Sequence, residues 1–134
     1  MADADPALAD YFAVSELYQD WNRRSLSTTN PLSPHERVAY LVVDYWIRLH
    51  MGDYDGLIYD EKRETVAALR AVNLDIQAKA LEHALSRSTE GAREQAISEI
   101  AHSMPRSIEV LMNNAVAAYL RKVQQSSVSE AENT

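Results

Sequence analysis

Apolar side chains recur at three- and four-residue spacing along most of the chain, which is the pattern of helices that bury one face. The stretches with this spacing predict six helices, at about 6–24, 34–50, 60–72, 75–86, 90–102 and 105–123. No stretch shows the alternation of apolar and polar residues that is typical of a strand. The sequence therefore predicts an all-α, single-domain bundle of about six helices.

Turn and capping residues divide these helices. Ser33-Pro34-His35-Glu36 predicts a capping box at the start of the second helix, because the Ser and Glu side chains can each accept from the other residue's backbone N–H. The polar stretch 51–60 contains two of the three Gly and predicts a turn. Asn73 tolerates the left-handed conformation that ends many helices, and Asp75 is predicted to cap the next helix. This very short connection predicts an antiparallel helical hairpin.

The second, third and fourth helices are predicted to form the centre of the bundle. Their apolar stripes place Leu41, Leu69, Ile76 and Leu81 inward. We expect one domain over 1–124 and a disordered, polar tail over 125–134, since the tail lacks periodicity.

Several classes of protein are disfavoured by composition. The chain has no Cys, which excludes disulfides and thiolate metal sites. No apolar run approaches the roughly 20 residues needed to span a bilayer, and the acidic N-terminus is unlike a signal peptide. We therefore expect a cytoplasmic protein that does not bind membranes.

The negative charge is concentrated in the first part of the chain. Residues 1–60 contain ten acidic residues against four arginines, a net charge of −6, whereas the whole chain carries −7. Such a field repels nucleic-acid phosphates and attracts basic surfaces. The sequence therefore predicts a basic protein partner and no direct binding to nucleic acid.

Nine of the ten aromatic residues lie in the same acidic part. They can fill the core, or some of them can form a protein-binding face together with carboxylates, since Tyr and Trp are enriched in binding hot spots. The predicted partner-binding residues are Asp10, Asp20, Asp44, Asp53, Tyr54, Asp55 and Tyr59.

Motifs for catalysis or metal binding are weak in this sequence. The four His residues are far apart and show no ligand spacing on one helix face. His50, Asp53 and Asp55 can meet in the turn after the second helix, which keeps a small hydrolase or a metal-dependent enzyme as an alternative. A calcium loop beginning at Asp53 would place Gly at position 4 instead of 6. We expect no catalytic residues, no metal and no cofactor.

The order of signals over 32–85 resembles a bacterial family of small, acidic, helical DNA-mimic proteins. Residues 32–38 (LSPHERV) resemble its capped helix entry, 64–73 (ETVAALRAVN) resemble its next helix and stop, and 77–85 (QAKALEHAL) resemble its following helix. The family's Asn-Asn-Gly-Gly-Phe turn is replaced here by His50-Met51-Gly52-Asp53-Tyr54, which keeps one Gly and an aromatic residue. The resemblance implies an acidic surface that imitates duplex phosphates and occupies the DNA-binding face of a basic protein.

The leading functional hypothesis is an acidic protein-interaction module that binds and blocks a basic partner, such as a DNA-binding regulator or a nuclease. An immunity or anti-defence inhibitor of a toxin or effector is an alternative, because it would use the same electrostatics. The sequence is also compatible with a homodimer.

Overall fold

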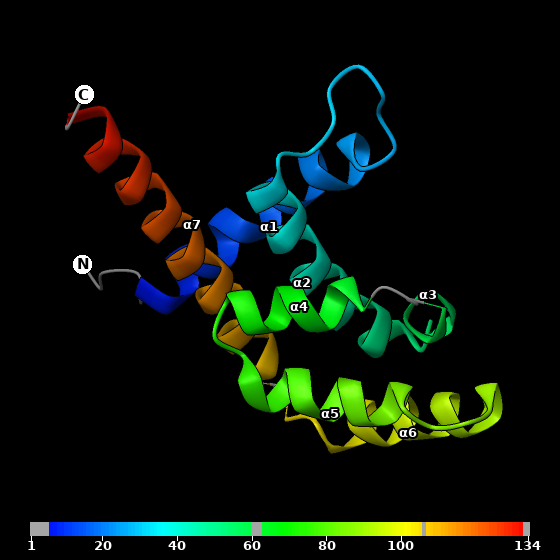
Figure 1. The fold of residues 1–134 in the computed structure, drawn as a ribbon. Coiled ribbons are helices and arrows are strands. Elements are labelled where there is room, and N and C mark those ends of the chain that lie inside the picture. The colour runs from blue at the N-terminus through cyan, green and yellow to red at the C-terminus, as the bar shows by residue number, and fades with distance from the viewer. Residues whose placement is uncertain (1–5, 60–62, 106, 133–134) are drawn as a thin grey trace.

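The computed structural model describes residues 6–59, 63–105 and 107–132, and within them it is all-helical (Figure 1). The all-α, single-domain prediction is confirmed. The helices are α1 (Pro6–Arg24), α2 (Pro34–Met51), α3 (Asp55–Ile58), α4 (Glu64–Ala71), α5 (Asp75–Leu85), α6 (Glu90–Ser103) and α7 (Ile108–Glu132).

Helix α2 lies at the centre of the molecule and contacts α1, α4, α6 and α7 (Figure 1). Its side chains Ala39, Val42, Val43, Tyr45 and Leu49 are buried. Helices α1 and α7 pack against each other, and α5 packs between α4 and α6. The predicted centre therefore includes α2, but α1 and α7 cover it as much as the following helices do.

The two ends of α2 follow local sequence rules. The Oγ of Ser33 accepts from the backbone N–H of Glu36 at 3.2 Å, and the N–H of Ser33 donates to Oε1 of Glu36 at 3.0 Å. Gly52 ends the helix with φ of 75°, a left-handed conformation that costs Gly little. The predicted capping box and Gly-containing stop are confirmed.

The segment after Gly52 differs from the prediction, because the expected turn over 51–60 contains the short helix α3. Leu57 and Ile58 of this helix are buried, and α3 contacts α6. Helix α4 begins at Glu64 and not near residue 60, since Arg63 has a left-handed φ of 54° that cannot continue a helix. Residues 60–62 lie outside the described part of the chain.

The connection between α4 and α5 has the predicted form. Asn73 adopts a left-handed φ of 65°, and the two helices run antiparallel (Figure 1). The predicted cap is wrong: Leu74 occupies the N-cap position and Asp75 is the first helical residue. An acidic side chain in a first turn still favours the helix, because it faces the positive end of the helix dipole.

Burial corrects two of the predicted core positions. Leu69 and Leu81 are fully buried, but Leu41 is only half-buried. Ile76 is 80% exposed, because it lies about 200° around α5 from the buried Ala78. Leu111 is 50% exposed although it lies among the apolar residues of α7 that recur at helical spacing.

Helix α7 is longer than expected. It begins at Ile108, three residues after the predicted start at Pro105, and it continues to Glu132. Residues 125–132, which we expected to belong to a disordered tail, are therefore helical, and no Gly or Pro interrupts them. Residues 106 and 133–134 lie outside the described part. None of the described helices combines the length and the apolar composition needed to cross a bilayer.

Truncation of the two buried leucines provides a test of this packing. Leu69→Ala and Leu81→Ala should each lower the free energy of unfolding by about 2–5 kcal/mol, since each leaves a cavity in a closed core. Ile76→Ala is the matched control on the exposed side of α5 and should change it by less than about 0.5 kcal/mol. Urea unfolding followed by circular dichroism measures all three. Comparable losses in all three variants would contradict the burial of α5 described above.

Candidate protein-binding site

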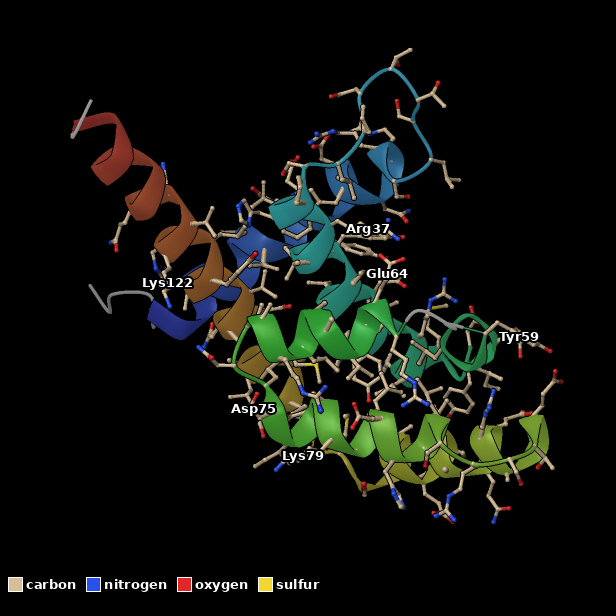
Figure 2. The ribbon with its side chains drawn as sticks, viewed as in Figure 1. Arg37, Tyr59, Glu64, Asp75, Lys79 and Lys122 are labelled. Carbon is tan, nitrogen blue, oxygen red and sulfur yellow. The ribbon has the colours of Figure 1, made fainter. Side chains whose placement is uncertain are left out.

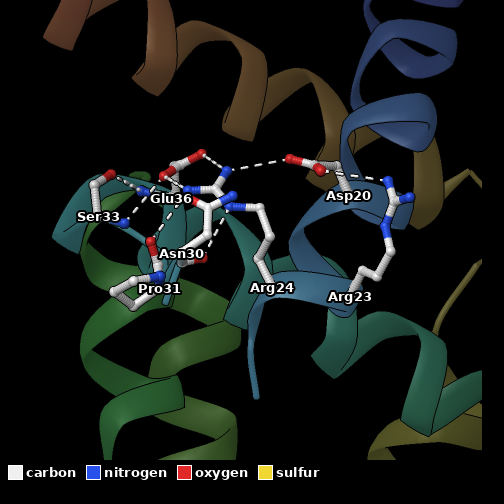
Figure 3. A network of polar contacts seen from close by, with 7 residues as sticks. All are labelled: Asp20, Arg23, Arg24, Asn30, Pro31, Ser33 and Glu36. Atoms are coloured by element: carbon white, nitrogen blue, oxygen red, sulfur yellow. Dashed lines mark hydrogen bonds and ion pairs between the residues drawn. The ribbon is translucent and has the colours of Figure 1, made fainter. Parts of the chain in front are cut away.

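Arg24, at the end of α1, holds the corner between α1 and α2 (Figure 3). Its Nη1 and Nη2 atoms donate to the two carboxylate oxygens of Glu36 at 2.6 and 2.9 Å, and Nη1 also donates to Asp20 at 3.1 Å. The backbone carbonyls of Asn30 and Pro31 accept from the same guanidinium. The hydrogen bond from Arg24 lowers the pKa of Glu36. Asp20 is thus part of a structural network.

Arg48 neutralises two further carboxylates of the predicted site. Its Nε atom donates to Asp44 at 2.7 Å, and its Nη1 atom donates to Asp53 at 3.1 Å. The guanidinium lies so close to Gly56 that a Cβ atom there would be 2.7 Å from Nη1. Asp44 also accepts from the hydroxyl of Tyr18 at 3.1 Å, and its side chain is only 17% exposed.

Internal pairing therefore accounts for much of the charge in the first 60 residues. Each of the four arginines there pairs with a carboxylate of this chain: Arg23 with Asp20, Arg24 with Asp20 and Glu36, Arg37 with Glu64, and Arg48 with Asp44 and Asp53. Three predicted binding residues, Asp20, Asp44 and Asp53, are thus engaged within the molecule.

The side chains proposed for a metal-dependent enzyme are separated. The imidazole of His50 stacks on Trp46 with ring centroids 5.1 Å apart, whereas Asp53 pairs with Arg48. Within the described residues, no three His, Asp or Glu side chains are placed to hold a metal ion. The structure does not bring His50, Asp53 and Asp55 into one site.

Tyr54 and Asp10 are two further residues of the predicted binding set. Tyr54 is half-buried and packs against the core, so its ring is less available than predicted. Asp10 belongs to α1, but its side chain lies outside the described part of the chain.

The remaining two predicted residues, Asp55 and Tyr59, lie on α3 and at its end, where they meet Glu90 of α6. Tyr59 is 61% exposed and its hydroxyl donates to the carboxylate of Glu90. This hydrogen bond, together with the charges of Glu90 and Asp55, raises the pKa of Tyr59, so the phenol stays protonated at neutral pH. We call Asp55, Tyr59 and Glu90 the acidic-aromatic patch.

The acidic-aromatic patch differs in its pairing from Asp20, Asp44 and Asp53. Among the described residues, no cation forms an ion pair with Asp55 or Glu90. The patch therefore offers two carboxylates beside an exposed aromatic ring, a combination that suits a cationic side chain of a protein.

We find no match to this chain among protein-family models, curated proteins or solved structures.

The pairing at the α1–α2 corner predicts a pH dependence of stability. The pKa of Glu36 is lowered in the folded state, so its stabilising effect is present above the ordinary glutamate pKa of about 4.3 and is lost as the pH falls through the lowered value. Glu36→Gln keeps a capping side chain but loses the charge, and it should cost about 1 kcal/mol at pH 7.

Thermal unfolding of both proteins between pH 7 and pH 3 measures this difference, which should shrink as the pH falls below about 4. Arg23→Met is the control, because its single 3.4 Å contact to Asp20 is largely exposed. A loss in Glu36→Gln that is equal at pH 7 and pH 3 would show that the charge of Glu36 contributes nothing.

Proposed function

We propose that this protein is a non-catalytic interaction module that binds and blocks a basic protein partner through the acidic-aromatic patch. One observation carries the proposal: an exposed tyrosine, Tyr59, is held by a hydrogen bond to Glu90 and has a second carboxylate, Asp55, beside it. The patch combines Asp55 and Tyr59, which the sequence predicted as binding residues, with Glu90 of the distant helix α6.

The chemistry of the patch favours an arginine or lysine of a partner. A cation that lies over the ring of Tyr59 gains a cation–π interaction, and its N–H groups can reach carboxylates at the ring edge. Tyrosine is also among the residues that dominate measured binding energies.

The charge of the whole chain supports the same partner. A net charge of −7 attracts a basic protein over a distance of about 8 Å at physiological ionic strength. The arginines of α1 and α2 are paired with carboxylates of this chain and so do not offset the patch with a free cation. Attraction of this kind raises the association rate and the specificity more than the final affinity.

A local patch is enough for this binding, and a row of carboxylates that imitates the phosphates of a DNA duplex is not required. A phosphate-like array requires carboxylates that face solvent in a row, but Asp20, Asp44 and Asp53 each have an arginine within 3.4 Å. Blocking then follows if the partner uses the same basic residues for its own ligand. A DNA-binding regulator or a nuclease has such residues, because phosphate contacts need Lys and Arg.

Affinity capture with variants of the patch tests this function. The wild-type chain, Tyr59→Ala and the double variant Asp55→Asn/Glu90→Gln are immobilised and exposed to lysate of the source organism at about 50 and 300 mM salt. Basic proteins that depend on the patch should be retained by the wild type at low salt and lost from both variants. The affinity of each purified candidate is then measured, and Tyr59→Ala should weaken it by about 10-fold or more.

A matched control separates this effect from net charge alone. Glu94→Gln/Glu99→Gln removes two exposed carboxylates of α6 outside the patch, and it should retain the same proteins as the wild type. If the patch variants and the control lose the same proteins equally, or if no basic protein distinguishes the wild type from Tyr59→Ala, the proposed function is wrong.

A further inference from the structure

A groove of the described surface lies at the other end of the molecule from the patch. It has a volume of about 540 Å³ and lies between α7 and the turn that joins α4 to α5. The turn contributes Ala71, Val72, Asn73 and Leu74, and α7 contributes Leu111, Asn114, Ala115, Ala118, Tyr119 and Lys122. Figure 2 shows Tyr59 at one end of the molecule and both Asp75 and Lys122 towards the opposite end.

Helix α7 is apolar on two adjacent faces, and this chain covers the second of them only in part. Met112 and Val116 are fully buried on the inner face. The groove face repeats at the same helical spacing, but Leu111 is 50% exposed and Ala118 is exposed. A helix that is apolar over more than one face is usually covered on each of them. Ala115 and Tyr119 of the second face pack against the core, whereas Leu111 and Ala118 are left exposed in the single chain.

The groove has the shape that a helix needs for close approach. Small side chains at Ala71, Ala115 and Ala118 allow another helix to come to the axial distance of about 8–10 Å at which helices pack. Asn114 lines the same groove, and its Oδ1 atom is buried without a hydrogen-bond partner in the described structure. This acceptor is available for a hydrogen bond from a second chain in the groove.

The charges at the edges of the groove are complementary to each other. Lys122 lies on the α7 side, and Asp75 directly follows Leu74 on the turn side. Both are exposed, and neither forms an ion pair with a described residue. A surface with one cation and one anion on opposite edges matches a second copy of itself under two-fold symmetry.

We propose that the groove is a homodimer interface, in which α7 of a second copy lies antiparallel against α7 and Lys122 of each chain meets Asp75 of the other. Helix α7 is 25 residues, or about 37 Å, long. The segment of α7 that lines the groove, from Leu111 to Lys122, would form the centre of the interface. The basic partner of the acidic-aromatic patch is a poor occupant, because Lys122 and the exposed Lys79 lie near this end.

Dimerisation through the groove leaves the acidic-aromatic patch of each chain free. A dimer would present two patches, so a partner that is itself dimeric would gain avidity without any new contact. The dimer does not depend on the proposed function, because it is measured with the purified chain alone.

Analytical ultracentrifugation of the full chain over a concentration series, from about 1 to 200 μM, tests the interface. The wild type should be dimeric at the upper end. Leu111→Asp, which adds a charge at a half-exposed position, should raise the dissociation constant by about 100-fold or more. Ala118→Glu provides a second variant if Leu111→Asp does not fold. Circular dichroism and thermal unfolding check that each variant keeps its helices.

Charge reversal identifies the contact between chains. Asp75→Lys and Lys122→Asp should each weaken self-association about three- to tenfold. An equimolar mixture of the two should recover it, because each mixed dimer then has two opposite-charge pairs. Lys79→Asp is the matched control on the next turn of α5 and should leave the dissociation constant unchanged. A wild type that is monomeric at every concentration, a dimer that tolerates both Leu111→Asp and Ala118→Glu, or mixing without recovery would overturn the proposal.

Discussion

The burial of α2 is the constraint on which the rest of this structure depends. Its apolar residues occupy most of its circumference, so four other helices must surround it. The polar residues of α2 are therefore confined to a narrow strip of its surface. On that strip Asp44 and Arg48 lie one turn apart and pair with each other. Burial of the central helix thus decides which carboxylates are available, because an acid on that strip has an arginine within reach.

The sequence predicted the helices well because their signals are local. The capping box at Ser33, the stop at Gly52 and the left-handed Asn73 each depend on a few adjacent residues, and all three are present in the structure. The errors lie where distant contacts decide. Helix α3 exists because Leu57 and Ile58 are buried and the helix packs against α6, and no pattern within four residues can show that. Ile76 was predicted inward because the apolar residues of α5 fit two faces of the helix. In the structure the face with Ala78 is the buried one.

The candidate site was predictable only in part for the same reason. Asp55 and Tyr59 are one helical turn apart and belong to the predicted set, but Glu90 is 31 positions further along and carries no local signal. A count of charges overstates the free acidity, since the pair between Arg24 and Glu36 spans 12 positions. The pairs of Asp44 with Arg48 and of Asp20 with Arg23 and Arg24 have three- or four-residue spacing, so helical periodicity could have shown these neutralisations in advance.

The two proposed interfaces, the acidic-aromatic patch and the groove along α7, differ in their physical chemistry. Their binding should therefore respond differently to added salt. Contacts at the acidic-aromatic patch are electrostatic and exposed, so added salt should screen them strongly. The proposed dimer contact along α7 would bury mainly Leu and Ala side chains, whose association salt does not screen, and its two symmetry-related ion pairs would be a small part of the interface. A protein that loses its basic partner at high salt but stays self-associated would therefore have two separate interfaces. The opposite placement of Tyr59 and Lys122 makes that separation geometrically possible, because a chain bound at one end leaves the other end open (Figure 2).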